Sequence, residues 1–562
     1  MSLFTLALIV AAVFGAAHLT YGRFLARHLE LKQDRKTPAC EVNDGVDFVP
    51  TGKRFLLAQH FSAIAAAGPI VGPILASLWF GWLPVLIWIV AGAVFFGAMH
   101  DFSSMVGSVR HKARSIVDIV GEQFGRRGYL AFLGFVWLSL LYVIIAFTDL
   151  TSSSFVDPEL GGAVAASSMM YLVLGLGMGA VLKFSRVPLW AATLIFLPLV
   201  FLSIVLGPSV PLVIPSFGGL SPQQIWNYLL LLYCLVASVI PVWLLLQPRG
   251  YLGGFFLYAI LAAGFIGLLL GGEQIQYPAF LGFTSEKGAP LFPILFVTVA
   301  CGACSGFHGI VCSGTTSKQI AKETDCHAVG YGAMLLEGLV AFLALATVMV
   351  LAKGSALAGA SPDRVYAEGL GNFVQHLGIP ADFARAFTLL AFTTFIYDTL
   401  DVATRLARYI IQELTGWRGK WGSWAAVLIS LAIPLACVSL KVTGPDGSVL
   451  PAWKVFWTLF GTSNQLLAAL TLMTIAAWMA RSGKAWVLAA LPMAFILAMT
   501  LWSLFLMMKP LLTALAQGRF PSDAIGAAAL VLTLLAFLLI AEAVRSLVPR
   551  LGREKIQGAT GS

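Results

Sequence analysis

Two long hydrophobic stretches of this chain are interrupted by small, polar or proline residues. The first covers residues 55–79 and is interrupted at 68–73, and the second covers 291–319 and is interrupted at 302–317. Backbone groups freed by such a break cannot face lipid, so they must line a polar cavity or a bound molecule. Interrupted spans at matching places in two halves of a chain are the best sequence indication of a transporter binding site.

Hydrophobic runs of about 20 residues, the length needed to cross a bilayer, recur along the whole chain. The pattern predicts fifteen spans, at 3–22, 55–79, 83–107, 129–153, 161–182, 188–206, 224–246, 251–271, 291–317, 328–352, 384–404, 421–440, 455–479, 485–508 and 522–544. With the N-terminus outside, the inside segments hold 27 of the 35 Lys and Arg residues, the outside segments hold 7, and Arg385 lies within a span. Because Lys and Arg concentrate on the cytoplasmic side, we expect the N-terminus outside and the C-terminus inside.

The order of the spans predicts an inverted repeat. Each broken span opens a set of five, and an odd number of spans separates the two breaks, so the broken helices cross in opposite directions. We therefore expect an all-α polytopic membrane protein with a leucine-transporter-type 5+5 inverted repeat and about five extra helices. The expected parts are an N-terminal helix with a basic loop (1–54), the first repeat (55–206), two inserted helices (207–290), the second repeat (291–480), and two C-terminal helices with a basic tail (481–562).

Composition agrees with a membrane protein and excludes other classes. The 562 residues are 59% hydrophobic and only 11% charged, well below the charge content of about 25% in soluble domains. The net charge of +9 lies mostly in loops, so it indicates membrane orientation and not nucleic-acid binding. The seven cysteines fall in or near apolar spans and in loops placed in the cytoplasm, which argues against a disulfide framework.

Several strings of residues resemble the carbon starvation protein (CstA) family, in the same order and over nearly the whole chain. They are residues 43–51, 60–73, 100–102, 305–308, 313–319 and 464–469, together with Asp398-Thr399, Arg405, Arg408 and Tyr409. The resemblance implies transport of peptides or pyruvate across a bacterial inner membrane, by a multi-pass member of the amino acid–polyamine–organocation superfamily. Two departures are Gln59, where many relatives have His, and the extra cysteines 301, 304 and 312.

The two breaks supply the candidate substrate-binding residues. Free amides at the start of a half-helix are electropositive and can hold a carboxylate, and His308 is an ionisable group at mid-membrane, where such groups are functional by default. The candidates are Gly68, Pro69, Gly72, Ser305, Gly306, Phe307, His308, Ser313, Thr315 and Thr316. Since few cations lie at mid-membrane, we expect monoanionic or zwitterionic solutes to be preferred over dicarboxylates.

Acidic residues inside the spans are the candidates for ion coupling. Burial disfavours the charged form of a carboxyl group, so such an acid can carry a proton near neutral pH. Asp149 has no cation nearby in sequence and is the first candidate, followed by Asp398 and Asp401, although Arg405 lies one turn beyond Asp401 and allows a structural ion pair. Hydroxyl groups one to two turns before Asp398 can complete a sodium site, those of Thr393 and Thr394. A proton is favoured over sodium.

A further set of polar residues can form a gate or a proton relay. It comprises His60, His100, Asp101, Glu337, Asn464 and Gln465. Helix-end hydrogen bonding explains His100 and Asp101 equally well, and hydrogen bonding between helices explains Asn464 and Gln465. The Cys301-x-x-Cys304 spacing superficially indicates a metal site, but small buried cysteines fit a membrane helix better, so we expect neither a metal nor a cofactor.

Three functions are compatible with these patterns. A secondary active transporter, energised by an ion gradient and acting on a small molecule, is favoured because the chain has two breaks and no Walker A motif. An intramembrane hydrolase is disfavoured, since neither a nucleophile-elbow motif nor HExxH occurs. A channel or nutrient sensor on a transporter scaffold is the third possibility. We therefore expect a transporter and not an enzyme.

Overall fold

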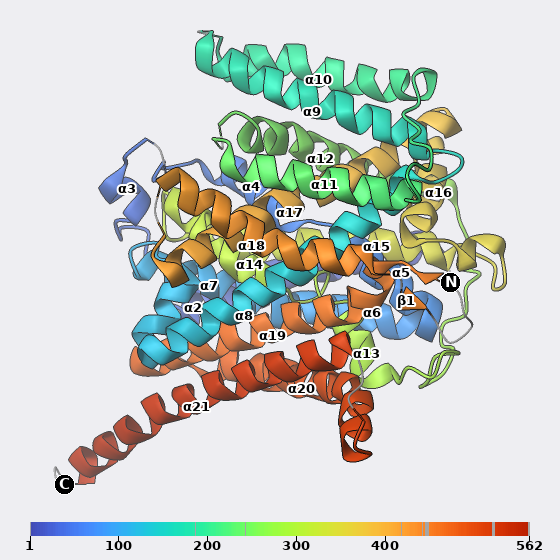
Figure 1. Ribbon diagram of the computed structural model, residues 1–562. Coiled ribbons are helices and arrows are strands. Elements are labelled where there is room, and N and C mark those ends of the chain that lie inside the picture. Colours follow the sequence, from blue (N-terminus) through green and yellow to red (C-terminus); the bar gives the residue numbers. More distant parts are fainter. Residues whose placement is uncertain are drawn as a thin grey trace.

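The computed structural model describes residues 2–45, 47–185, 187–241, 243–417, 419–440, 442–443, 449–519 and 523–559. Apart from one antiparallel pair of two-residue strands, β1 (Val442–Thr443) and β2 (Val449–Leu450), the regular structure in these residues is helical. In Figure 1 the outer pairs α9–α10 and α20–α21 lie on opposite sides of the molecule, with α8, α14, α17 and α19 between them.

The helices of the first half are α1 (Leu3–Leu19), α2 (Tyr21–His28), α3 (Pro38–Val42), α4 (Lys53–Ile64), α5 (Gly68–Phe80), α6 (Trp82–Ala91), η1 (Gly92–Gly97), α7 (Ala98–Arg110), α8 (Ile116–Phe155), α9 (Gly161–Phe184), α10 (Leu189–Leu206), η2 (Gly207–Ser209), α11 (Pro222–Val239) and α12 (Leu246–Gly271). The remaining helices are α13 (Leu291–Thr298), α14 (Gly306–Gly314), η3 (Thr316–Gln319), η4 (His327–Tyr331), α15 (Gly332–Met349), η5 (Ala356–Gly359), α16 (Pro362–Gln375), α17 (Ala381–Thr415), α18 (Gly419–Ser439), α19 (Ala452–Arg481), α20 (Val487–Ala516) and α21 (Ala524–Ala559).

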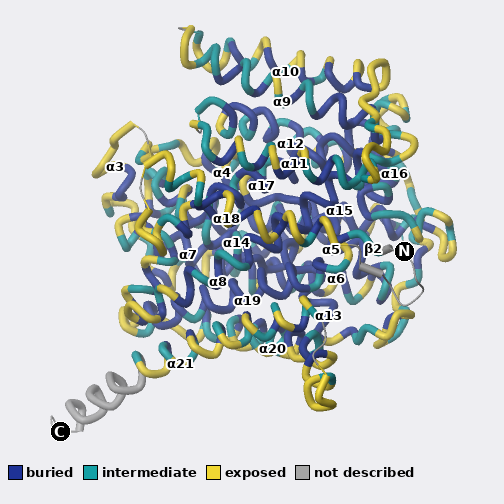
Figure 2. Tube along the Cα trace, viewed as in Figure 1, coloured by how far each residue is buried: buried dark blue, intermediate teal, exposed yellow. Residues whose placement is uncertain are grey.

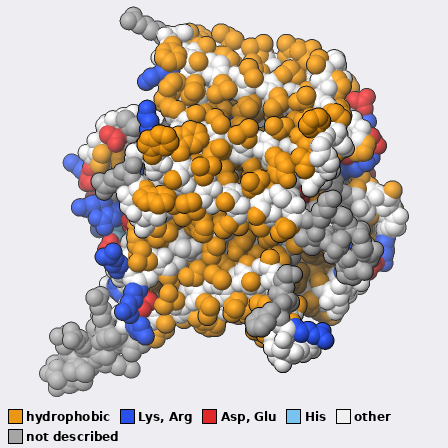
Figure 3. Space-filling model, viewed as in Figure 1, with side chains coloured by type: hydrophobic (Ala, Val, Ile, Leu, Met, Phe, Trp, Pro, Cys, Tyr) orange, Lys and Arg blue, Asp and Glu red, His pale blue; other side chains and the backbone are white. Residues whose placement is uncertain are grey.

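The chain is a multi-pass membrane protein. In the described part of the chain, 12 helices are long and apolar enough to cross a membrane, or 13 if the bent pair α4–α5 counts as one span. The three other expected spans correspond to α4–α5, to α11 and to the pair α13–α14. Apolar side chains cover most of the face shown in Figure 3, and Lys and Arg side chains gather along the left edge. The total of fifteen spans, the orientation and the repeat remain predictions.

The buried core lies around the two breaks. Figure 2 shows the most buried trace around α8, α14 and α19, with exposed residues along α10 and α20. Helix α19 packs against α8, α14 and α20, and α5 packs against α15 and α13. Three buried serine and threonine hydroxyls in α19 bond back to a carbonyl of their own helix, which satisfies these polar groups inside an apolar core.

Both breaks lie a few residues before the expected positions. The first covers residues 65–67 and bends the α4–α5 pair by 51°, so the expected break residues 68–73 are helical. Gly68 and Pro69 form the first turn of α5, where proline is tolerated because the first amides of a helix have no partner within it. The second break covers 299–305, and the helix resumes at Gly306.

The start of α5 packs directly against the second break and the end of α13. A Cβ atom at Gly68 would collide with Sγ of Cys301, and one at Gly72 would collide with the carbonyl oxygen of Thr298. Residue numbers rise along α5 as they fall along the facing segment, so the two segments run antiparallel. Glycine is required at these positions because the Cys301 side chain at Gly68 and the Thr298 backbone at Gly72 leave no room for a Cβ atom.

Two π-helical turns occur in the helices that follow the breaks. Segment η1 (Gly92–Gly97) connects α6 to α7, and η4 (His327–Tyr331) leads into α15. Such turns hold one extra residue per hydrogen-bonded loop and frequently occur at functional sites. Each comes shortly before a buried acid, Asp101 in α7 and Glu337 in α15.

One buried glutamate joins three segments outside the spans. Glu323 accepts hydrogen bonds from the backbone N–H of Lys32 at 2.8 Å, from Arg35 Nη1 at 2.6 Å and from Arg110 Nε at 2.8 Å. Burial alone would raise the pKa of Glu323, but these hydrogen bonds and the Arg110 charge outweigh it and lower that pKa below its ordinary value. The glutamate therefore links the α2–α3 connection, the end of α7 and the segment before η4.

Candidate functional site

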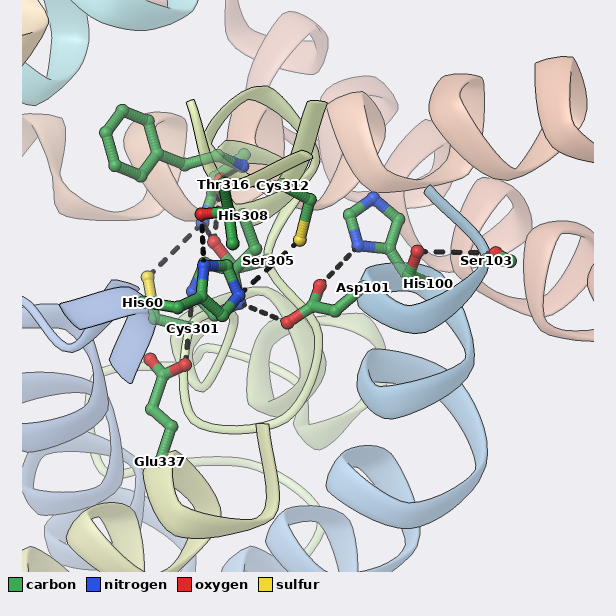
Figure 4. Close-up of polar contacts among 12 residues, drawn as sticks. His60, His100, Asp101, Ser103, Cys301, Ser305, His308, Cys312, Thr316 and Glu337 are labelled. Atoms are coloured by element: carbon green, nitrogen blue, oxygen red, sulfur yellow. Dashed lines mark hydrogen bonds and ion pairs between the residues drawn. The ribbon is translucent and has the colours of Figure 1, made fainter. Parts of the chain in front are cut away.

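His308 lies at the third residue of α14, directly after the second break. Its side chain is 1% exposed. Nδ1 lies 2.9 Å from Asp101 Oδ2, and Nε2 lies 3.1 Å from Glu337 Oε2. Figure 4 shows the imidazole ring between the two carboxyl groups, which come from different helices.

Asp101 is the polar centre of this group. Its side chain is fully buried, and its two oxygens contact two different imidazoles, His308 and His100. Oδ1 lies 2.7 Å from His100 Nδ1. An ionised carboxylate accepts from both rings, so Asp101 can stabilise positive charge on either histidine.

Glu337 is buried without a hydrogen bond. It is fully shielded from solvent, and neither side-chain oxygen has a hydrogen-bond partner among the residues that the structure describes. The distance to His308 is that of an ion pair, although the angle does not meet the geometry of a hydrogen bond. A buried carboxyl group with one imidazole as its neighbour is costly to ionise unless that imidazole is protonated.

His60 adds a residue of the first broken span to this group of buried side chains (Figure 4). This histidine is 1% exposed and belongs to α4, the half-helix before the first break. Its Nδ1 lies 2.8 Å from Thr316 Oγ1, and its Nε2 lies 3.6 Å from Cys312 Sγ. We call His60, His100, Asp101, His308 and Glu337 the histidine–acid cluster. Its members come from α4, α7, α14 and α15, so a movement of any of these helices alters its contacts.

Asn464 of α19 caps the start of α14. Its Oδ1 accepts from the backbone N–H of Phe307 at 3.0 Å and from Ser305 Oγ at 3.3 Å. Gly306 allows this approach, since a Cβ there would collide with the backbone of Asn464. An amide oxygen therefore occupies the electropositive start of α14, the position at which a carboxylate would bind.

A small cavity adjoins this cap. It has a volume of about 10 Å³, room for no more than about one water molecule. Its lining is mostly apolar and comes from α8, α14 and α19: Val136, Ser139, Leu140, Val143, Phe307, Ile310, Asn464 and Leu467. A solute as large as a small organic acid requires the surrounding helices to separate.

Asp149 lies apart from the histidine–acid cluster, and its partners in the described residues are neutral hydrogen-bond donors from two other helices. Oδ1 accepts from Asn227 Nδ2 at 2.9 Å and from Gln223 Nε2 at 3.0 Å. Oδ2 accepts from the backbone N–H of Trp453 at 2.9 Å, in the first turn of α19. These bonds tie α8 to α11 and to the start of α19.

Asp398 and Asp401 form a second group with a residue that sequence reasoning missed. Their partner is Arg249, whose Nη2 lies 2.7 Å from Asp398 Oδ1 and 2.7 Å from Asp401 Oδ2. The expected partner, Arg405, instead donates to the carbonyls of Ala237 at 2.6 Å and Ile240 at 2.9 Å. The sequence signal for Arg249 is a single arginine next to an apolar span. The hydropathy pattern places this arginine in a loop, whereas α12 begins at Leu246.

The remaining candidates lie near these groups without joining them. The hydroxyls of Ser313, Thr315 and Thr393 donate to carbonyls of their own helices, and Thr394 Oγ1 has no partner among the described residues. Gln465 is fully buried, and neither of its amide atoms has a partner in the described part of the chain. No group of three or more His, Cys, Asp or Glu side chains in the described ranges is arranged to hold a metal ion.

A bundle of membrane-crossing helices that encloses buried ionisable groups beside two helix breaks is typical of membrane transport proteins. Sequence comparison gives the family. The family model described as "Carbon starvation protein CstA" matches residues 2–366 and 353–503. The chain belongs to this family, as its motifs indicate.

Named relatives are transporters. The chain is 32% identical to the peptide transporter CstA of Helicobacter pylori strain J99, over 91% of this chain and 83% of that protein. It is 33% identical to the peptide transporter CstA of Mycobacterium tuberculosis strain H37Rv, over 88% of this chain and 74% of the relative. The pyruvate/proton symporter BtsT of Escherichia coli K12 is 28% identical, over 88% of this chain and 80% of its own length.

Among solved structures, a manganese transporter of Eremococcus coleocola in complex with an aromatic bis-isothiourea compound is similar at a TM-score of 0.48 and 15% identity. The match covers 89% of this chain and 96% of that one. A likeness of this degree carries no argument about function.

Proposed function

We propose that this protein is a secondary active transporter of the bacterial inner membrane that moves a small carboxylate-bearing solute, a peptide or pyruvate, together with protons. The observation that carries the proposal is the position of His308, held between Asp101 and Glu337 at the end of a helix break. The names of the relatives support both solutes, and one relative is named a proton symporter.

The charges of the histidine–acid cluster favour proton coupling. A protonated His308 between two ionised acids leaves one negative charge in excess, and burial makes an uncompensated charge costly. One more proton, bound by Glu337, removes that excess. Because the members sit on separate helices, gaining or losing this proton changes the energy of packing α14 against α7 and α15.

The start of α14 is the proposed carboxylate site. The backbone N–H of Phe307 and the hydroxyl of Ser305 both donate to Asn464 in the closed arrangement. A substrate carboxylate can replace the Asn464 oxygen and gain a charge-assisted hydrogen bond in its place. The partial charge of about +0.5 at a helix start suits one carboxylate and not two, so monoanions and zwitterions are preferred over dicarboxylates.

Uptake into proteoliposomes tests the coupling role. With labelled pyruvate or a labelled dipeptide and an imposed pH gradient, we expect Glu337→Gln and His308→Gln to reduce the accumulation ratio roughly 5-fold or more, since coupling between two sites typically amounts to 5–150-fold. Exchange of substrate across the membrane without a gradient should persist in Glu337→Gln, because the carboxylate site is intact.

His376→Gln is the matched control. His376 also pairs with a glutamate, Glu273 at 3.4 Å, but it is about one-third exposed and lies away from the breaks. It should accumulate substrate like the parent protein. If Glu337→Gln accumulates substrate with the parent's pH dependence, the cluster does not couple protons. If succinate competes as well as pyruvate or a dipeptide, the proposed carboxylate site is wrong.

A further inference from the structure

A second buried ionisable group lies between α12 and α17, separate from the histidine–acid cluster. Arg249, in the first turn of α12, is 1% exposed. Its Nε and Nη2 donate to Asp398 Oδ1 at 2.9 and 2.7 Å, and Nη2 also pairs with Asp401 Oδ2 at 2.7 Å. The two acids lie three residues apart on one face of α17. We call these three residues the arginine–acid cluster.

Three tyrosines fix the arginine–acid cluster in place. Tyr233 of α11 donates its hydroxyl to Asp401 Oδ2 at 2.8 Å and accepts from Arg249 Nη1. The rings of Tyr233 and Tyr397 lie 5.8 and 5.9 Å from the guanidinium carbon. Tyr171 of α9 donates to the backbone carbonyl of Arg249 at 2.5 Å. The guanidinium is thus held by directed bonds and aromatic faces and cannot readily turn away.

The arginine–acid cluster lacks one positive charge. Arg249 contributes one, and Asp398 and Asp401 contribute two negative charges when both are ionised. Arg405, one turn farther along α17, keeps its charge but donates to two carbonyls at the end of α11, and it forms no ion pair with either acid in the described part of the chain. Asp401 Oδ1 is buried and has no hydrogen-bond partner among the described residues, although the other oxygen has two neighbours. An ionised oxygen without any partner is the most costly state for a buried carboxyl group.

We propose that Asp401 is a second proton-binding site of this protein, with the proton on Oδ1. An O–H bond forms there when a proton arrives from water, and the cluster becomes neutral while Tyr233 keeps its bond to Oδ2. The charged and titratable groups that face Asp401 are Arg249 from α12, Tyr233 and Cys234 from α11, Tyr171 from α9, and Tyr397, Asp398 and Arg405 from α17 itself. The site stands on its own geometry and does not depend on the transported solute.

Infrared difference spectroscopy on the purified full-length protein tests this site directly. Spectra between about pH 5 and about pH 8, the range in which perturbed groups near neutrality titrate, report protonated carboxyl groups. We expect Asp401→Asn to lose the signal of one protonated carboxyl per chain. Asp398→Asn should lose it too, because Asp401 then balances Arg249 without a proton. Either variant suffices if the other does not fold.

Asp382→Asn is the control on the same helix. Asp382 has a 92% exposed side chain, and its one ion-pair partner among the described residues is Arg385, three residues away, so its loss should leave the signal unchanged. A spectrum of Asp401→Asn or Asp398→Asn that retains the full signal would overturn the proposal. Transport is not measured, so failure here is distinct from failure of the proposed function.

Discussion

His308 differs from most buried histidines because carboxyl groups from two other helices reach the same ring. Asp101 and Glu337 lie 2.9 and 3.1 Å from its two nitrogens. Two acids that compete for one imidazole share their protons, so the titration belongs to the group and not to one residue. A single substitution in the group therefore redistributes the remaining protons and does not simply delete one of them.

Substitutions of Asn464 test whether its side chain occupies the site of a substrate carboxylate or only holds α19 against the start of α14. Asn464→Asp puts a permanent carboxylate at the start of α14, where helix-end charge effects amount to about 0.3–2 kcal/mol. We expect this variant to take up substrate at least about tenfold more slowly than Asn464→Ala, which vacates the position. Initial uptake rates in proteoliposomes give the comparison.

Asn372→Asp is a suitable control, since Asn372 is exposed on α16 and its one side-chain bond within the described ranges is to Gln375. It should transport like the parent protein. Equal rates for Asn464→Asp and Asn464→Ala would show that the substrate carboxylate does not compete for the start of α14.

Individual residues of the site could be predicted from sequence, but their grouping could not. His308 and the intramembrane acids are conspicuous because ionisable side chains are rare inside spans. Which acid meets which base depends on helix rotation and tilt, and these follow from packing across the whole bundle. The same limit explains why Arg249 was missed and why Arg405 was expected to pair with Asp401.

At the scale of elements, the facing breaks impose strict limits on side-chain size. The segment after Gly68 runs against residues 298–302 with backbone in direct contact. Close approach of this kind in membranes relies on small residues and van der Waals contact. The breaks are therefore held by packing as much as by any bound molecule.

Gly72→Ala should weaken this contact. Its Cβ would collide with the carbonyl oxygen of Thr298 and lie 3.2 Å from Cα of Val299, so backbone and not a flexible side chain must move. Overpacking of this kind costs about 1–3 kcal/mol. Thermal unfolding in detergent, followed by intrinsic fluorescence, should show a lower melting temperature than the parent protein.

The matched control is Gly15→Ala in α1, where a Cβ meets nothing within 4 Å. Alanine there improves helix propensity by up to about 1 kcal/mol and should not lower the melting temperature. A Gly72→Ala protein as stable as Gly15→Ala would mean that the two breaks separate freely.

The existence of both breaks could be predicted, but their exact positions could not. Gly and Pro mark a disruption, and proline also suits the first turn of a helix. The sequence 68–73 was therefore interpreted as the gap, whereas it is the start of the next half-helix. Which alternative holds depends on the segment that packs against residues 68–73, and the local sequence does not specify that segment.

At the scale of the whole molecule, hydropathy is sufficient to find most spans. Twelve of the fifteen expected segments coincide with helices long and apolar enough to cross a membrane in the described residues. Of the remaining three, the bent pair α4–α5 passes the same test when it counts as one span, whereas α11 and the pair α13–α14 do not. Contacts between segments far apart in the sequence, such as those of Glu323, leave no pattern in the sequence comparable to the hydrophobic runs that mark the spans.

Glu323→Gln should loosen the contact between the α2–α3 connection and α7. The carboxylate accepts three hydrogen bonds, two of them from arginines, and bonds to charged groups contribute about 1.5–3 kcal/mol each. Because the folded-state pKa is lowered, this stabilisation is complete above the ordinary carboxyl pKa of about 4.3. It is lost as the pH falls through the lower, folded-state pKa.

Melting temperatures measured over a pH series check this sign. The difference between parent and Glu323→Gln should be constant around neutrality and shrink in acid. Glu122→Gln is the control, since Glu122 has a 48% exposed side chain and only long contacts to Arg114 and His111; it should show little difference at any pH. A gap between parent and Glu323→Gln that widens in acid would contradict the assignment.

The two π-helical turns allow the helices that carry Asp101 and Glu337 to rotate about their own axes. Each holds one residue more than an α-helical turn, upstream of Asp101 in one case and of Glu337 in the other. Each residue of an α-helix turns the chain by about 100°. Conversion of either π-helical turn to α-helical hydrogen bonding would therefore rotate the acid that follows it by about that angle. The acid would then point away from His308. One extra residue in a helix is thus enough to bring an acid to His308 or turn it away without moving the helix axis.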